Sequence, residues 1–469
     1  MLPLNSYKFP PVMPGLARGL FVAVIIAAFQ PANKAVAANE ISSFQVSNSQ
    51  SGVVVEWVMP ESEAEKDGIK PGDVIDGWSR AVEHGTIDSP FSFTWVEIEQ
   101  KPRGPLRLEG LRGTEKLSWK FSTDQMGLRV RPLMPDHLAH TYEEALALAD
   151  AGKIKEAAEL WRGAAHETTA SDPDWLASWL LTRAAESLSR AQRGKDGSLF
   201  FEEAVQRCPQ NALRVKALVL KSWAESMRQE DEPEKSESLF RAALEQLGPA
   251  GERSLLAASL MEGIALAKYT RNEAVQTKEV LTKSLAIRQE VAPESSAVAS
   301  SLLWLGAAEM NGDNPSSAQR YLEEAASIDS RLAPVSPDMA EISNCLGILA
   351  EHRGDLEHAE QYTQQTLSIG EKLGRPKAGT AAMLVNLGAI AQARGDFIAA
   401  ERYLKESLSI TEGIGPSLSI SAAAHNNLGS VMVDEGKLNE AGPDQFAPDW
   451  RACYIIRSPP LMSNVAPVM

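Results

Sequence analysis

The chain has 469 residues, of which 44% are hydrophobic and 23% charged, and its formal net charge is −16 at pH 7. This acidic excess disfavours nucleic acid as a partner, because the nucleic-acid backbone is itself polyanionic. The composition is typical of a soluble, largely helical protein, and the length alone predicts about three domains of ~150 residues each.

Residues 1–37 have the pattern of a secretory signal peptide. Lys8 and Arg18 precede an apolar run at residues 19–29, and Ala35-Val36-Ala37 offers small residues at the −3 and −1 positions of a cleavage site. The run of about 11 residues is shorter than the ~20 that a membrane-spanning helix needs. We expect cleavage before Ala38 and an exported, periplasmic or extracellular protein; an uncleaved N-terminal anchor, the only expected contact with a membrane, is the alternative.

Residues 40–132 change to alternating and β-branched side chains with frequent glycine. The run Val53–Val58 predicts a strand, the sequence GIKPGDVI at residues 68–75 predicts a turn, and further strands are expected at residues 106–108 and 117–121. This order resembles a bacterial PDZ domain, in which a strand leads into a short helix, a Gly-Ile-Lys-Pro-Gly-Asp turn follows, and a hairpin closes the domain.

The resemblance implies that an extended peptide adds to the edge of the sheet, with Val53, Val54 and Val55 as the strand that receives it. The glycine-containing loop that would hold the peptide carboxylate does not precede Gly52 in this sequence, and Met126-Gly127-Leu128 is a displaced candidate. Two interpretations remain: the domain binds a peptide, or it is a structural cap for the segment that follows.

That segment contains an internal repeat of 41 residues. A leucine-glycine pair recurs at this interval (306+41=347, 347+41=388, 388+41=429), and an alanine follows each glycine by 12 residues. Apolar residues three and four apart before and after a second glycine predict two helices joined by a turn. We expect that glycine to be left-handed and the aspartate after it to cap the second helix. The residues concerned are Leu305-Gly306, Leu346-Gly347, Leu387-Gly388 and Leu428-Gly429, the alanines 318, 359, 400 and 441, the second glycines 312, 354, 395 and 436, and the aspartates 313, 355 and 396.

These small and large positions resemble the tetratricopeptide repeat. The family's common unit has 34 residues, and the present unit is longer by about two helical turns, which is similar to the kinesin-light-chain type. Weaker copies upstream give seven full units and a broken eighth over residues 138–442. The predicted fold is therefore mainly α, an α-α superhelical solenoid preceded by a small β-rich PDZ-like domain.

A solenoid of this family implies a non-enzymatic scaffold or adaptor that binds a protein or peptide along the concave surface of its first helices. Polar residues near the Leu-Gly pairs are the candidate contacts, although a solvated helix face is the simpler interpretation of any one of them. They are Asn344, Glu351, Asn386, Gln392 and Asn427. Trp304, at the equivalent position upstream, is either an aromatic anchor or part of the core.

No catalytic, cofactor or metal site is predicted. Cys208 and Cys345 are 137 residues apart (345−208=137), too far along a solenoid for a disulfide, and His137 with His140 lacks a third ligand. Bacterial proteins that resemble this arrangement often continue into a caspase-like CHAT peptidase domain. The alternative function is therefore the regulatory, substrate-recognition portion of a peptidase whose catalytic domain is missing.

Residues 443–469 depart from the repeat. Gly442-Pro443 interrupts the second helix of the eighth unit, and four further prolines follow within the tail, so that a continuous helix is excluded. The sequence predicts an irregular Pro-rich tail, which is either natural or the result of a frameshift or truncation.

Overall fold

A computed structural model describes residues 51–60, 62–122, 126–191, 194–312, 314–374, 377–414 and 418–435. The predicted signal segment and the predicted tail lie outside these residues. The chain divides into two compact units whose boundary in the repeat region falls between Pro334 and Val335, and each unit is described by itself.

The first unit begins with a six-stranded antiparallel sheet whose order is β5-β4-β2-β1-β6, with β3 paired to β2. Apolar side chains on alternate residues of the strands, such as Val53 and Val55 or Leu106 and Leu108, form its core because successive side chains of a strand point to opposite faces. The elements are β1 (Val53–Val58), α2 (Glu63–Lys66), β2 (Val74–Arg80), β3 (Glu83–Thr86), α3 (Pro90–Glu99), a short 3-10 turn (Lys101–Arg103), β4 (Leu106–Arg112), β5 (Glu115–Phe121) and β6 (Leu128–Pro132).

The prediction that Val53, Val54 and Val55 form an edge strand is wrong. Val53 pairs with Ile75 of β2 on one side and with Pro132 of β6 on the other, so the backbone groups of β1 are already used. The outer strand is β6, which starts at Leu128, directly after the Met126-Gly127 pair.

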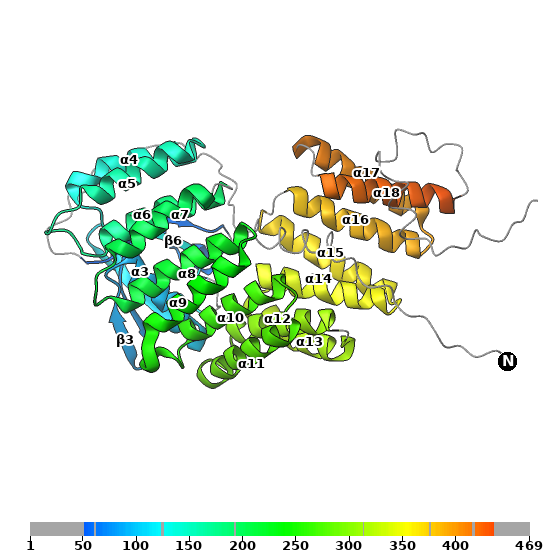
Figure 1. Ribbon diagram of the computed structural model, residues 1–469, viewed down its shortest axis with the longest axis horizontal. Helices are drawn as coiled ribbons and strands as arrows, with labels where there is room; N and C mark the ends of the chain where they lie inside the picture. The colour runs from blue at the N-terminus through cyan, green and yellow to red at the C-terminus, as the bar shows by residue number, and fades with distance from the viewer. Residues whose placement is uncertain are drawn as a thin grey trace, which may run out of the picture. The chain divides into compact units, whose positions relative to one another are not determined.

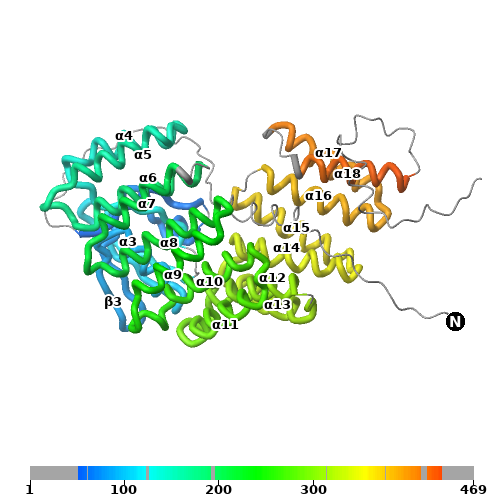
Figure 2. Tube along the Cα trace, viewed as in Figure 1, coloured from blue at the N-terminus to red at the C-terminus, as the bar shows by residue number. Residues whose placement is uncertain are grey.

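Fifteen helices follow in the described residues, and fourteen of them pair as antiparallel hairpins (Figures 1 and 2). We call the even-numbered helices A helices and the odd-numbered ones B helices. Seven A/B pairs and one further A helix are described, which confirms the predicted solenoid. The first unit holds α4 (Asp136–Asp150), α5 (Ile154–His166), α6 (Leu176–Arg190), α7 (Gly194–Arg207), α8 (Leu213–Gln229), α9 (Pro233–Gly251), α10 (Leu255–Thr270), α11 (Ala274–Val291), α12 (Ser296–Asn311) and α13 (Pro315–Leu332). The second holds α14 (Pro337–His352), α15 (Leu356–Lys372), α16 (Lys377–Ala393), α17 (Phe397–Ile414) and α18 (Leu418–Asp434).

The turns between paired helices follow the predicted chemistry in two of the repeats. Gly354 and Gly395 have φ values of 76° and 78°, and the carboxylates of Asp355 and Asp396 accept backbone N–H groups of the next helix. The left-handed prediction is wrong for Gly312, whose φ is −93°. In that turn the N-cap of α13 is Asn314, and Asp313 lies outside the described residues. Gly436, the second glycine of the last repeat, also lies outside them.

The glycines of three Leu-Gly pairs, Gly306, Gly347 and Gly388, face the B helix of their own hairpin. A Cβ atom at Gly306 or Gly388 would lie 2.7 Å from the Cγ atom of Leu322 or Leu404, which is closer than real contacts allow. Gly347 is less tightly enclosed, since its nearest contact would be 3.4 Å. Two hairpins therefore require glycine at this position.

In three hairpins a hydroxyl group of the B helix forms a hydrogen bond to the A helix of the same hairpin. In each case the hydroxyl donates to a carbonyl of the paired A helix 26 residues earlier, at a position where a helix carbonyl accepts a second bond. The bonds join Ser284 to Ala258, Thr366 to Ala340 and Ser407 to Ala381. Because these donors are one or two repeats apart, the bond is a property of the repeat.

Replacement of Gly388 by leucine should force α16 and α17 apart and cost about 1–3 kcal/mol through overpacking. Because each repeat contacts only its neighbours, hydrogen exchange should accelerate from Leu346 to Ile410 and stay unchanged in α4 to α7. Gly413→Leu is the matched control, since a Cβ there meets nothing within 4 Å. Equal loss of protection along the whole chain would contradict a solenoid.

Candidate binding surfaces

The predicted contacts Asn386 and Asn427 lie one repeat apart on the A helices α16 and α18. Both side chains are half-buried, and neither makes a hydrogen bond to a described residue. Small side chains flank Asn386 on the same helix face, namely Ala382, Ala389 and Ala393. The Asn386 amide thus lies beside the partly exposed small side chains of Ala389 and Ala393.

Asn344 does not occupy the repeat position of Asn386 and Asn427 but the position one residue before it. Its repeat equivalent is Val385 (344+41=385), and the position equivalent to Asn386 is taken by Cys345, which is 1% exposed. Asn344 is half-buried on α14 and shares a helix face with Ile348 and with the exposed Glu351. The structure therefore places Asn344 and Glu351 on one A-helix face without repeating the Asn386 position.

The amide of Gln392 is used inside the solenoid. Its Nε2 donates to Ser430 Oγ at 2.8 Å and to Asp434 Oδ2 at 2.6 Å, which ties α16 to α18. Trp304 is 8% exposed and makes an edge-to-face contact with Tyr269, their ring centroids 6.0 Å apart. Trp304 is thus part of the core.

The sheet domain contacts the A helices α4, α6, α8 and α10 of the first unit, and its strands lie behind the helices α6 to α9 in Figure 1. Helix α3 supplies much of the contact. Phe91 is 7% exposed and meets Trp175, at the start of α6, edge-to-face with centroids 6.4 Å apart. The guanidinium of Arg214 on α8 lies 4.5 Å from the ring centroid of Trp95.

Glu99, the last residue of α3, reaches the N-terminus of α10. Its carboxylate accepts the backbone N–H of Leu256 at 2.7 Å and a bond from Arg103 at 3.0 Å, and the residue is only 3% exposed. A negative charge is favourable there because the first N–H groups of a helix are unpaired and carry the positive end of its dipole.

Glu56 of β1 forms a second polar contact with the solenoid. Its carboxylate accepts the hydroxyl of Tyr142 on α4 at 2.5 Å and the guanidinium of Arg183 on α6 at 2.9 Å, and Arg129 of β6 lies 3.5 Å away. Burial would raise the pKa of Glu56, but Arg183 and the Tyr142 hydroxyl hold it below its ordinary value. The carboxylate therefore stays charged and joins β1 to α4 and α6.

Glu97 lies on α3 between Trp95 and Ile98. Burial raises the pKa of its carboxyl to about 8. The folded protein therefore holds a proton that an unfolded chain releases near pH 4.5, so stability should fall as pH rises from about 4.5 to 8. Glu97→Gln should abolish this loss of stability between pH 5 and 8, because glutamine has no titrating carboxyl. We expect the loss to amount to about 1–3 kcal/mol, since the Glu97 side chain is partly exposed and solvent screens its charge. Urea unfolding at both pH values measures it, and equal pH slopes for the two proteins would disprove the assignment.

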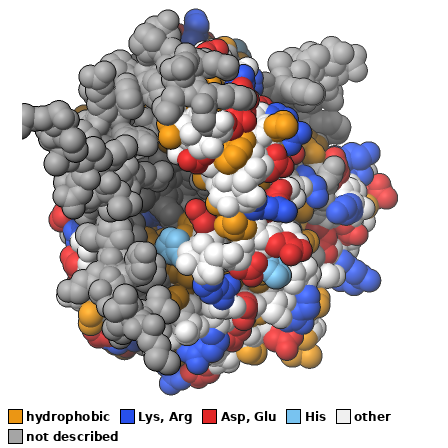
Figure 3. All heavy atoms as spheres, turned by 90° about the vertical axis from the view of Figure 1, so that its right-hand side faces the viewer, with side chains coloured by type: hydrophobic (Ala, Val, Ile, Leu, Met, Phe, Trp, Pro, Cys, Tyr) orange, Lys and Arg blue, Asp and Glu red, His pale blue; other side chains and the backbone are white. Residues whose placement is uncertain are grey.

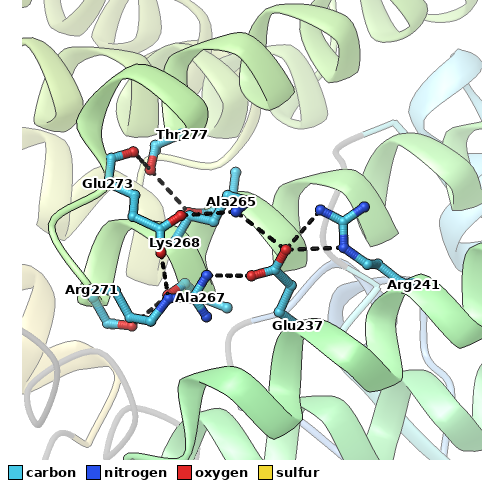
Figure 4. A network of polar contacts seen from close by, with 9 residues as sticks. Glu237, Arg241, Ala265, Ala267, Lys268, Arg271, Glu273 and Thr277 are labelled. Atoms are coloured by element: carbon cyan, nitrogen blue, oxygen red, sulfur yellow. Dashed lines mark hydrogen bonds and ion pairs between the residues drawn. The ribbon is translucent and has the colours of Figure 1, made fainter.

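A charge network joins α9, α10 and α11 (Figure 4). Lys268 Nζ lies 3.3 Å from Glu237 and 2.9 Å from Glu273, and Arg271 pairs with both carboxylates. These hydrogen bonds lower the pKa of Glu273 to about 2. Because its charges are mutually satisfied, we assign this network to the stability of the turn.

The described residues contain no group of three metal-ligating side chains, and none of their helices is long and apolar enough to cross a bilayer. Burial raises the pKa of the thiols of Cys345 and Cys208, which disfavours the nucleophilic thiolate. Figure 3 shows acidic and basic side chains interspersed over the visible coloured part of one face.

Part of this chain is similar to several solved structures. BtubC (BKLC) from P. vanneervenii is 22% identical, with 52% of this chain and 95% of that chain covered and a TM-score of 0.38. The apo form of RapI is 14% identical, with 65% and 85% covered and a TM-score of 0.45. A Rap protein complexed with Competence and Sporulation Factor is 13% identical, with 69% and 87% covered and a TM-score of 0.44. Among curated protein sequences, none matches this chain.

The model of the tetratricopeptide repeat family matches residues 379–441. This stretch contains most of α16, all of α17 and α18, and the Leu387-Gly388 and Leu428-Gly429 pairs. The helical part of the chain is a solenoid of paired helices, and residues 379–441 carry the tetratricopeptide repeat that the family's model describes.

Proposed function

We propose that this protein is a non-enzymatic scaffold that binds a protein partner on the A-helix face of α14, α16 and α18. The observation that carries this proposal is the pair of half-buried amides at Asn386 and Asn427, one repeat apart and without a hydrogen bond to a described residue. An amide both donates and accepts, so two of them at repeat spacing suit the backbone of a bound segment. The small side chain of Ala389, which is partly exposed one turn from Asn386, lets that segment approach closely.

We further propose that the sheet domain acts as an internal partner of the solenoid. Its order of elements resembles a bacterial PDZ domain, but β1 has no free edge for a peptide. Helix α3 and Glu56 instead rest on the A helices α4 to α10. The sheet domain thereby occupies the first A helices, and the A-helix face of α14, α16 and α18 binds the external partner.

A photo-crosslinking amino acid at Ala389 tests the binding surface in cells that express the protein. We expect one dominant crosslinked protein when the amino acid is at position 389. The same crosslinked protein should not appear when it is at Ile398, an 82% exposed residue of the B helix α17 that serves as the control. The same adduct from both positions would overturn the proposal.

The purified partner should then bind the double variant Asn386→Ala, Asn427→Ala more weakly by about 1–3 kcal/mol, because its backbone groups lose their bonds to the amides. Asn311→Ala, at an exposed position of α12, is the matched control. Unchanged affinity of the double variant would assign the two amides to a solvated surface.

We also propose that the protein is exported, on the evidence of the apolar run at residues 19–29 and the small residues before Ala38. N-terminal sequencing of the protein from its native host should give Ala38 as the first residue. An intact Met1 on protein extracted from membranes would show that the segment is an anchor.

A further inference from the structure

The A helices of the second unit carry an excess of negative charge. Helix α14 holds Asp338, Glu341 and Glu351, and α18 holds Asp434. Lys377, the first residue of α16, is the one lysine or arginine in these three helices. Glu351 and Asp434 are exposed, so the face that we propose as a binding surface is acidic and attracts a basic partner.

Glu351 is an exposed carboxylate at the contact between α14 and α16. It lies on the same face of α14 as Asn344 and Ile348, which precede it by seven and three residues. The adjacent Ala350 belongs to one apolar cluster with Ile390 of α16, and these residues are 0% and 2% exposed. The end of α14 that carries Glu351 therefore packs against α16. Within the described part of the chain, the Glu351 carboxylate has no hydrogen bond or ion pair.

The next pair of A helices shows what can fill this position. Gln392 is the repeat equivalent of Glu351 (351+41=392), and its amide donates two hydrogen bonds to side chains of α18, at 2.8 and 2.6 Å. On α16, the equivalents of the two acceptors are Ala389 (430−41=389) and Ala393 (434−41=393), which have no polar side-chain atom. Glu351 thus stands beside small side chains where the following repeat forms two bonds, and a side chain of a partner has room there.

Asp434 supplies a second unpaired charge on the same surface. It follows Asn427 by seven residues, about two turns, and therefore shares its face of α18. The Gln392 amide orients the carboxylate, but no basic side chain of the described residues pairs with it. Asp434 is also the last residue of α18, where the negative end of the helix dipole disfavours a further negative charge. A positive charge at this position is therefore favourable.

We propose that the partner bound on the A-helix face of α14, α16 and α18 presents an extended segment with basic side chains; this inference rests on the function proposed above. One lysine or arginine lies over Ala389 and Ala393 and pairs with Glu351, because its methylene stem packs on small apolar side chains while its charged end reaches a carboxylate. A second basic side chain pairs with Asp434. The backbone between the two bonds to the amide of Asn386.

The test uses the full chain at low ionic strength and a fluorescein-labelled probe of about ten residues in which serine and lysine alternate, long enough to span two repeats as an extended chain. A matched probe has acetyl-lysine in place of lysine, which keeps the length of the side chain and removes its charge. We expect fluorescence anisotropy to show saturable binding of the lysine probe that salt weakens, and an affinity lower by about tenfold or more for the acetyl-lysine probe. Equal binding of the two probes would overturn the basic partner.

The variants Glu351→Gln and Asp434→Asn should each lower the affinity for the lysine probe by about threefold to fivefold, as the loss of one ion pair at a surface gives. Glu406→Gln is the matched control, since Glu406 is an exposed acid of the B helix α17 and its replacement changes the net charge equally. The chain has a net charge of −16 and attracts any basic peptide, so this comparison is needed. An equal loss in Glu351→Gln and Glu406→Gln would overturn the proposal.

The double variant Asn386→Ala, Asn427→Ala separates this inference from the proposed function. If it loses the lysine probe while Glu351→Gln and Asp434→Asn keep it, the binding surface stands and the basic partner is rejected. If the carboxylate variants lose the probe and the double variant keeps it, the basic partner stands and the amides are rejected as backbone contacts.

Discussion

Replacement of Glu56 by alanine should lower the free energy of unfolding of the first unit by about 3–5 kcal/mol, because it leaves a buried guanidinium without its counter-charge. The side chains of Glu56 and Arg183 are 4% and 9% exposed, and the Tyr142 hydroxyl loses its acceptor as well. Urea unfolding followed by tryptophan fluorescence measures the change, since the Arg183 guanidinium lies 5.7 Å from the Trp161 ring centroid.

Glu279→Ala is the control for this prediction. Its carboxylate pairs with Lys283 at 2.8 Å, but both side chains are more than 60% exposed, and such surface pairs contribute about 0–1 kcal/mol. A similar small loss in the two variants would mean that Glu56 is hydrated in solution and that β1 does not rest on α6.

Phe91→Ala should cost about 3–5 kcal/mol, because it empties a site between α3 and the core of the first hairpins. Phe91 is 7% exposed and belongs to the same apolar cluster as Leu176 and Trp179 of α6. The loss should appear as faster hydrogen exchange at α6 and at the amide of Leu256, whose acceptor Glu99 is carried by the same helix.

Val82→Ala serves as the control within the sheet domain, since Val82 is 92% exposed and its truncation should change stability by less than about 0.5 kcal/mol. Exchange that accelerates only inside the sheet, with α6 and Leu256 unaffected, would contradict the docking of α3 on the A helices.

The repeat was predictable because its period fixes several positions at once. Gly388 is needed where the A helix meets Leu404, and Asp396 is needed where the B helix starts, so both kinds of residue recur in the sequence. Gly312 shows the limit of this reasoning. Gly312 follows Gly306 by six residues, whereas Gly354 and Gly395 follow Gly347 and Gly388 by seven, so Gly312 lies one residue earlier in its turn and has a φ of −93°.

Strand neighbours in the sheet domain were not predictable from local pattern. The segment Val53–Val58 is clearly a strand, but its two partners come from residues 74–75 and 128–132. Strand β6 alternates leucine and valine with Arg129 and Arg131, and it is short, so its pairing depends on contacts made only in the folded domain.

Helix α3 was missed although its sequence carries a start signal. Ser89 and Pro90 are a favourable N-cap and first residue, and the aromatic and aliphatic residues Phe91, Trp95 and Ile98 have helical spacing. The alternating pattern on either side of it favoured strands. Likewise, no local signal links Glu56 to Arg183, which are 127 residues apart.

The repeat register predicted the helix positions of the candidate contacts, and their contact with a partner stays a prediction. Asn386 and Asn427 occupy equivalent half-buried positions, as the register implies. The register could also have exposed the role of Gln392, since Asp434 lies 42 residues further on, almost one repeat away. A side chain of that length reaches the next A helix, and its amide is satisfied there.

A double-mutant cycle between Glu56 and Arg183 tests most directly whether the sheet domain rests on the solenoid. The single variants Glu56→Gln and Arg183→Met and their combination are compared by urea unfolding. We predict a coupling energy of about 1.5 kcal/mol or more, as close charge pairs in buried contacts give. Additive losses within about 0.5 kcal/mol would contradict the contact, and with it the assignment of the first A helices to an internal partner.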